Sequence, residues 1–418
     1  DKISVNIETF FADKHQVKYS IIRFENYSSL SDLELQGFYG LTITNLERSE
    51  AADFKDILTG FNNGKGNFDL NRINEVNHFV TIKLINNMGK LGAGVIIYNR
   101  NLNRIVNIRY YEEQINKREI ELLSIKDPGV SSREYFKVFD LRVNKNLLNI
   151  VSCDIKGAEY LFFLLTDRID IYTIVKNSIS KKSTRRINWE KPYFPSIKNE
   201  GNLFLFKENS EIFFAAGSNF SKYSYVYKLE GSELKSHSRM EFSIADVIKI
   251  NDVRYIAGFN YNFGMNFYKG KLFLKQFKHL NFNSGETFAK TLPDFYSAAF
   301  YKEGDDFRSI FLIDLDYNMR VFSDTMNEAA GFESKFGSTH AISGNVIAVS
   351  DHVDKNDRLR MLKIGNIMTP LFDIRIKGEI KLIKNGILKG NKGFWIIVEN
   401  NIKGIGKLNL QFWRKNID

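Results

Sequence analysis

The chain has 418 residues, a formal net charge of +10, and a composition that is 43% hydrophobic and 26% charged. This length exceeds what one compact core usually holds and predicts two domains, and the apolar content excludes a chain that is disordered throughout. The single cysteine cannot form an intramolecular disulfide, and no run of about 18 apolar residues predicts a membrane-spanning helix.

The first 129 residues mix helical and strand periodicity, which predicts an α/β domain over residues 1–129. Ser31 and Asp32 are suitable N-cap residues for the longest expected helix. The expected elements, in chain order, are a strand over 17–24, helices over 31–46 and 70–73, strands over 78–84, 94–99 and 104–111, and a helix over 112–121.

Beyond residue 130, short alternating strands separated by turn residues replace the helical patterns. Aromatic residues make up 14% of the chain, and large rings favour strands. Strand units recur about every 40–50 residues, the size of one four-stranded propeller blade. We therefore predict an all-β domain over residues 130–418 that folds as a six-bladed β-propeller, with a pair of β-sandwiches or a large barrel as the alternative. The clearest units begin at residues 201, 296, 344 and 393.

Most of the excess positive charge is scattered along the chain, and residues 181–186 form the densest basic run. We interpret this run as a solvated loop. The sequence has no zinc finger, basic recognition helix or RNA-binding sheet signature, so we expect no nucleic-acid partner.

We predict no catalytic, cofactor-binding or metal-binding residues, and no cofactor. Cys153 lies in an apolar run and is expected to be a buried hydrophobic residue. No histidine has metal-ligand spacing to another histidine or to the cysteine, although His340 and His352 flank one strand and could approach each other. The acidic stretches 314–318 and 351–357 place oxygen atoms at alternate positions, which suits calcium. Because both lack a glycine and a closing acidic ligand, we interpret them as blade turns, with calcium binding left open.

Residues 19–26 and 74–84 and the hairpin around residues 98–101 resemble the first strands of the TolB family of periplasmic proteins. The resemblance implies an α/β domain followed by a propeller, and a role in interactions within the bacterial envelope. The propeller signature Trp-Ser-Pro-Asp-Gly of that family is missing, and residues 206–211 occupy its place without matching it. No binding residue of the family can therefore be assigned here.

These observations predict a non-enzymatic protein-binding scaffold, periplasmic or associated with the outer membrane, that docks envelope lipoproteins or outer-membrane machinery. The first residue, Asp1, would fit a mature chain after removal of a signal peptide, with membrane attachment through a lost N-terminal lipid anchor as a further expectation. Two alternatives remain. One is an accessory of outer-membrane assembly similar to BamB, and the other is an enzyme or a sugar- or ligand-binding protein with its site in the central funnel. A funnel lined by clustered His, Asp or Glu would favour an enzyme, and one lined by aromatic rings and mixed charges would favour binding.

Overall fold

The computed structural model describes residues 19–25, 78–87, 90–99, 105–114, 135–143, 146–175, 178–190, 200–208, 210–219, 221–262, 267–276, 287–304, 306–351, 357–365, 368–402 and 405–416. These residues form strands and turns, and none of them lies in a helix. Within this part of the chain there is accordingly no helix that could cross a membrane.

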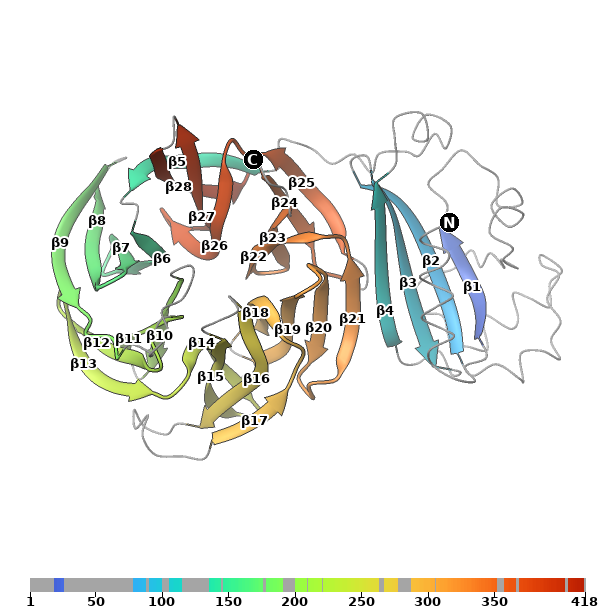
Figure 1. The fold of residues 1–418 in the computed structure, drawn as a ribbon, viewed down its shortest axis with the longest axis horizontal. Helices are drawn as coiled ribbons and strands as arrows, with labels where there is room; N and C mark the ends of the chain where they lie inside the picture. The colour runs from blue at the N-terminus through green and yellow to red at the C-terminus, as the bar shows by residue number, and fades with distance from the viewer. Residues whose placement is uncertain are drawn as a thin grey trace.

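Four sheets contain four antiparallel strands each, and they lie around a common centre in Figure 1. The first is β6 (Leu147–Ile155), β7 (Ala158–Leu165), β8 (Arg168–Val175) and β9 (Ser178–Arg186). The second is β10 (Gly201–Glu208), β11 (Glu211–Ser218), β12 (Ser224–Glu230) and β13 (Glu233–Met240). The third is β22 (Phe336–Ser343), β23 (Val346–Asp351), β24 (Arg358–Lys363) and β25 (Thr369–Arg375). The fourth is β26 (Glu379–Leu388), β27 (Asn391–Ile402), β28 (Ile405–Lys415) and β5 (Tyr135–Val143).

A fifth, twelve-stranded sheet includes the remaining strands of the ring and the four N-terminal strands. Its ring strands are β14 (Ser243–Ile250), β15 (Val253–Asn262), β16 (Phe267–Gln276), β17 (Thr287–Thr291), β18 (Phe295–Glu303), β19 (Asp306–Asp314), β20 (Met319–Ser323) and β21 (Glu328–Glu333). The N-terminal strands are β1 (Tyr19–Glu25), β2 (His78–Asn87), β3 (Lys90–Asn99) and β4 (Ile105–Gln114). They lie outside the ring, where β4 runs parallel to β21 and pairs with it from Ile108–Ala330 to Tyr111–Glu333.

Tight turns between antiparallel strands explain why so many short strands follow one another. Residues 156–157, 251–252 and 389–390 all have positive φ, as a two-residue hairpin requires. Gly157 and Gly390 supply this conformation without a side-chain clash.

The ring closes by pairing segments from its two ends. β5 hydrogen-bonds to β28 along eight residue pairs, from Val143–Leu408 to Tyr135–Lys415. The rings of Phe139, Trp395 and Phe412 pack behind this pairing, with Trp395 5.6 Å from Phe139 and 4.6 Å from Phe412 between ring centroids. Aromatic side chains of this kind fill the spaces between neighbouring sheets.

The structure corrects the predicted fold class. An α/β N-terminal domain is wrong for the described residues, which are strands throughout. Residues 112–114, expected to begin a helix, instead end strand β4, whereas the expected helices over 31–46 and 70–73 lie outside the described residues. The prediction of six separate blades is also wrong, because four sheets have the blade form and β14–β21 belong to the twelve-stranded sheet, where the pairs Lys249–Asp306 and Tyr268–Phe295 join β14–β17 to β18–β21. The predicted domain boundary at 129/130 falls in a segment that is not described.

The basic run 181–186 was also misassigned, since it forms most of strand β9 instead of a loop. β9 is the outermost strand of its sheet, so most of its side chains face water and no apolar alternation marks it in the sequence.

Candidate functional site

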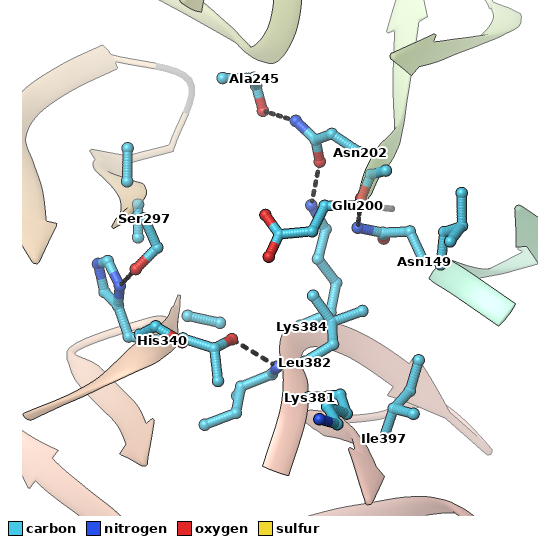
Figure 2. A pocket seen from close by; sticks show the side chains of 18 of the residues that line it. Asn149, Glu200, Asn202, Ala245, Ser297, His340, Lys381, Leu382, Lys384 and Ile397 are labelled. Atoms are coloured by element: carbon cyan, nitrogen blue, oxygen red, sulfur yellow. Dashed lines mark hydrogen bonds between the residues drawn. The ribbon is translucent and has the colours of Figure 1, made fainter. Parts of the chain in front are cut away.

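A cavity of about 470 Å³ lies on the axis of the ring. Most of its lining residues come from the strands nearest the centre in Figure 1, namely β6, β10, β14, β18, β22 and β26, or directly precede them. Each innermost strand contributes several residues to the lining, so polar residues far apart in the sequence meet there. Figure 2 shows this cavity, and the residues that matter for its chemistry are Asn149, Glu200, Asn202, Asp246, Tyr268, Ser297, His340, Lys381 and Lys384.

Lys384 on β26 extends into the cavity toward β10. Its ammonium donates to Oδ1 of Asn202 over 3.1 Å, while Nδ2 of Asn202 donates to the carbonyl of Ile244 over 2.6 Å. The second bond fixes the amide so that its oxygen faces Lys384. Burial lowers the pKa of Lys384 to about 8, and repulsion from Lys302 acts in the same direction, against attraction by Asp246.

Two carboxylates in the cavity wall are paired with lysines of the protein itself. Asp246 accepts from Lys302 over 2.9 Å and from the backbone N–H of Val247 over 2.7 Å. Glu399 lies 3.0 Å from the ammonium of Lys381, which also lies 2.6 Å from Glu379. Both carboxylates therefore already have an ammonium partner within the protein before any ligand enters.

Ser297 on β18 and His340 on β22 form a hydrogen-bonded pair at the cavity wall (Figure 2). Nε2 of His340 lies 3.1 Å from the carbonyl of Phe311, which can only accept, so this nitrogen carries the hydrogen. Nδ1 then accepts from the Ser297 hydroxyl over 2.7 Å. Burial lowers the pKa of His340 to about 4, against the hydrogen bond to Phe311, so the ring is neutral at ordinary pH.

A second feature lies on the outside of the ring, where the outermost strands β9 and β13 of two neighbouring sheets meet. The Ser183 hydroxyl donates to the carbonyl of Ser232 over 2.7 Å, and Nη2 of Arg185 donates to the Ser236 hydroxyl over 2.5 Å. The two strands therefore present one continuous surface. We call it the basic rim, and its basic residues are Lys181, Lys182, Arg185, Arg186, Lys235 and Arg239.

Asp170 holds part of the basic rim in place. This carboxylate is buried and accepts from Lys181 over 2.9 Å and from Thr184 over 2.8 Å. Burial alone would raise its pKa, but these hydrogen bonds and the charges of Lys181 and Arg168 lower it below the ordinary value. Lys182 and Arg186 are exposed and make no ion pair within the described part of the chain.

The structure can be compared with the sequence predictions for Cys153, for His352 and for the two acidic stretches. Cys153 is buried, as predicted, and burial raises its pKa to about 12. His352 lies outside the described residues, so its approach to His340 stays a prediction. In the stretch 314–318, Oδ1 of Asp314 accepts the backbone N–H groups of Asp316 and Asn318, and Oδ2 accepts from Arg320 over 2.9 Å, which makes it a hairpin turn. Residues 352–356 of the other acidic stretch are not described.

Among the described residues, no group of three His, Cys, Asp or Glu side chains could hold a metal ion.

Sequence reasoning did not find Lys384, Asn202 or the pair Ser297–His340. Lys384 directly follows the apolar pair Leu382–Ile383 and, with Asn385 and Gly386, interrupts the apolar residues of β26, and that interruption is a local signal that could have indicated it.

No protein-family model matches this sequence, and no curated protein matches it. Among solved structures, BBS1N in complex with ARL6DN is similar with 8% identity and a TM-score of 0.42, covering 68% of this chain and 98% of that one. A Bacteroides fragilis protein thought to be exported has 11% identity and a TM-score of 0.41, covering 69% and 97%. TolB from Acinetobacter baumannii has 10% identity and a TM-score of 0.31, covering 94% and 93%. These likenesses concern the fold alone. The arrangement of the chain's own four-stranded sheets around one centre is that of a divergent propeller, and membership of the TolB family is not shown.

Proposed function

We propose that this chain is a non-enzymatic binding scaffold of the bacterial envelope that docks an acidic surface of another protein on its basic rim. The observation that carries the proposal is the junction of β9 and β13, where hydrogen bonds between the two sheets join two outermost strands that together carry six basic residues, among them the exposed Lys182 and Arg186.

The charge of the rim defines the kind of partner. β9 carries four basic residues and no acidic one. Asp170 engages Lys181 from inside the sheet, so Lys182 and Arg186 remain directed to solvent. A surface of this sign attracts carboxylates over several ångströms and favours fast association with an acidic partner.

The lining of the axial cavity supports a binding role over an enzymatic one. It combines aromatic rings such as Tyr268 and Tyr296 with amides and charges of both signs. The Ser297–His340 pair has the spacing of a nucleophile and base, but the lowered pKa of His340 makes its ring a weak base at neutral pH.

The envelope location and the nature of the partner rest on the sequence resemblance of residues 19–26 and 74–84 to TolB proteins. Envelope lipoproteins and outer-membrane machinery are the partners that this resemblance favours. An acidic patch on such a protein would match the rim.

Chemical crosslinking in intact cells that produce the protein, followed by purification and identification of its partners, tests the proposal. We expect an envelope protein to be recovered with the wild-type chain and lost with the charge-reversal variant K182E/R186E. The matched control K271E/K290E makes the same change in charge at exposed positions on β16 and β17, and it should retain the partner. Equal recovery with both variants, or recovery of cytoplasmic proteins alone, would contradict the proposal.

A further inference from the structure

We propose that the axial cavity is a binding site for a small organic monocarboxylate, with the ammonium of Lys384 as its anchor. This site is independent of the basic rim, because it is formed by the innermost strands of the ring and the rim by the outermost ones.

The first argument is the unused hydrogen-bonding capacity of Lys384. An ammonium group has three N–H donors, and one of them is engaged by Asn202 at 3.1 Å. Within the described part of the chain, no carboxylate lies within 4.0 Å of this ammonium, which points into the cavity. An ammonium in the wall of a recessed cavity, with donors to spare, attracts an anion, so the cavity favours a ligand that supplies a carboxylate.

The second argument concerns the acidic residues that could otherwise have satisfied Lys384. Asp246 is engaged by Lys302, and Glu399 by Lys381. Asn202 occupies the position where a carboxylate would have formed an ion pair with Lys384, and the Ile244 carbonyl holds its amide oxygen there. The protein thus places a neutral acceptor beside the ammonium of Lys384, and a ligand can supply the carboxylate that pairs with it.

The third argument narrows the ligand class. The carboxylate of Glu200 points toward the middle of the same space (Figure 2). A carboxylate at this place disfavours a ligand with several negative charges, and a hydroxyl or ammonium group of a ligand can approach it. We infer that the ligand carries one carboxylate with such a donor nearby, as hydroxy acids and amino acids do.

The shape of the cavity agrees with a ligand of this size. Its volume of about 470 Å³ falls within the range of small-molecule pockets. Tyr268 and Phe295 stack with ring centroids 5.4 Å apart and form an apolar part of the wall against which a carbon chain can pack.

Calorimetric titration of the purified chain tests this site with four probes: gluconate, glutamate, sorbitol and citrate. We expect gluconate or glutamate to bind, sorbitol, which lacks the carboxylate, to bind at least about tenfold more weakly, and citrate to be disfavoured by its extra charges. K384M should lower the affinity for the bound monocarboxylate by at least about tenfold. K363M removes the same charge from an exposed position on β24 and should leave binding unchanged.

A second variant keeps the test decisive if K384M fails to fold. N202D places a carboxylate beside Lys384, so the ion pair within the protein should compete with the ligand and weaken binding although the lysine remains. The site is overturned if neither monocarboxylate binds the wild-type chain, or if a folded K384M or N202D variant binds as the wild type does. K182E/R186E should leave this binding intact, so failure of the rim and failure of the cavity are distinguishable.

Discussion

The indole N–H of Trp395 donates to the hydroxyl of Ser152 over 2.9 Å and thereby connects strand β27 to strand β6 of the neighbouring sheet. The same hydroxyl accepts the backbone N–H of Ile387 over 2.9 Å. One serine thus serves two donors at the junction between the sheet that closes the ring and the sheet that follows it. Because Trp395 is fully buried, its N–H has no route to solvent when this acceptor is removed.

S152A is therefore expected to lower the free energy of unfolding by about 1–3 kcal/mol, because it leaves a buried donor without an acceptor. Urea unfolding followed by tryptophan fluorescence measures the change. S180A, at an exposed position on β9, should stay within about 0.5 kcal/mol of the wild type. Equal stability of S152A and S180A would show that the connection contributes little.

A substitution in the aromatic cluster that packs behind strands β5 and β28 should lower the free energy of unfolding more than S152A does. Phe412 is fully buried against Trp395, on the strand that pairs with β5. F412A should lower the free energy of unfolding by about 3–5 kcal/mol, since it creates a cavity in a packed interface. F288A removes the same ring from an exposed position on β17 and should cost far less. Similar losses in the two variants would argue against closure through β5 and β28.

The buried His340 gives a prediction about pH. Its pKa in the folded chain is lowered to about 4, so between that value and the ordinary pKa near 6.5 the unfolded chain binds the extra proton. Stability from the neutral ring is complete above about pH 6.5 and is lost as the pH falls toward 4, by about 3 kcal/mol in total. H340Q should show a flatter decline in denaturant midpoint between neutral and acidic pH than the wild type. Parallel declines in the two proteins would contradict burial of a neutral ring.

Lys384 should react with acylating reagents at lower pH than other lysines. Burial lowers its pKa to about 8, so half of its side chains carry the nucleophilic amine near that pH, whereas an ordinary lysine needs about pH 10.4. Acetylation of Lys384 and of the exposed Lys363, followed by peptide mass spectrometry across this pH range, measures the two midpoints. A common midpoint would show that the cavity does not perturb Lys384.

The individual strands could be predicted well from sequence because short apolar or alternating runs are separated by turn residues. The pattern at residues 201–206, 211–216 and 223–229 marks β10, β11 and β12, and the structure confirms all three. Alternation reports which side of a strand is buried, and it carries no information about which strand lies next to it. The pairing of β5 with β28 and of β4 with β21 joins segments more than 200 residues apart, so the ring closure and the twelve-stranded sheet were not predictable.

The candidate sites were missed for two different physical reasons. β9 has polar side chains on most of its positions because it is an outermost strand, and a strand without apolar alternation resembles a loop in sequence. The axial cavity combines single residues from separate strands, such as Asn202 on β10, Ser297 on β18 and Lys384 on β26. No spacing between neighbouring residues in the chain reveals such a combination.

The most direct test of the proposed scaffold places a photoreactive amino acid at one rim position in living cells. Incorporated in place of Lys182, it should crosslink to an envelope protein with an acidic surface, whereas the same amino acid in place of Lys290 on β17 should not. A partner captured from position 182 alone would establish the basic rim as the docking surface. Equal crosslinking from both positions, or none from position 182, would contradict the central claim that this propeller binds its partner through β9 and β13.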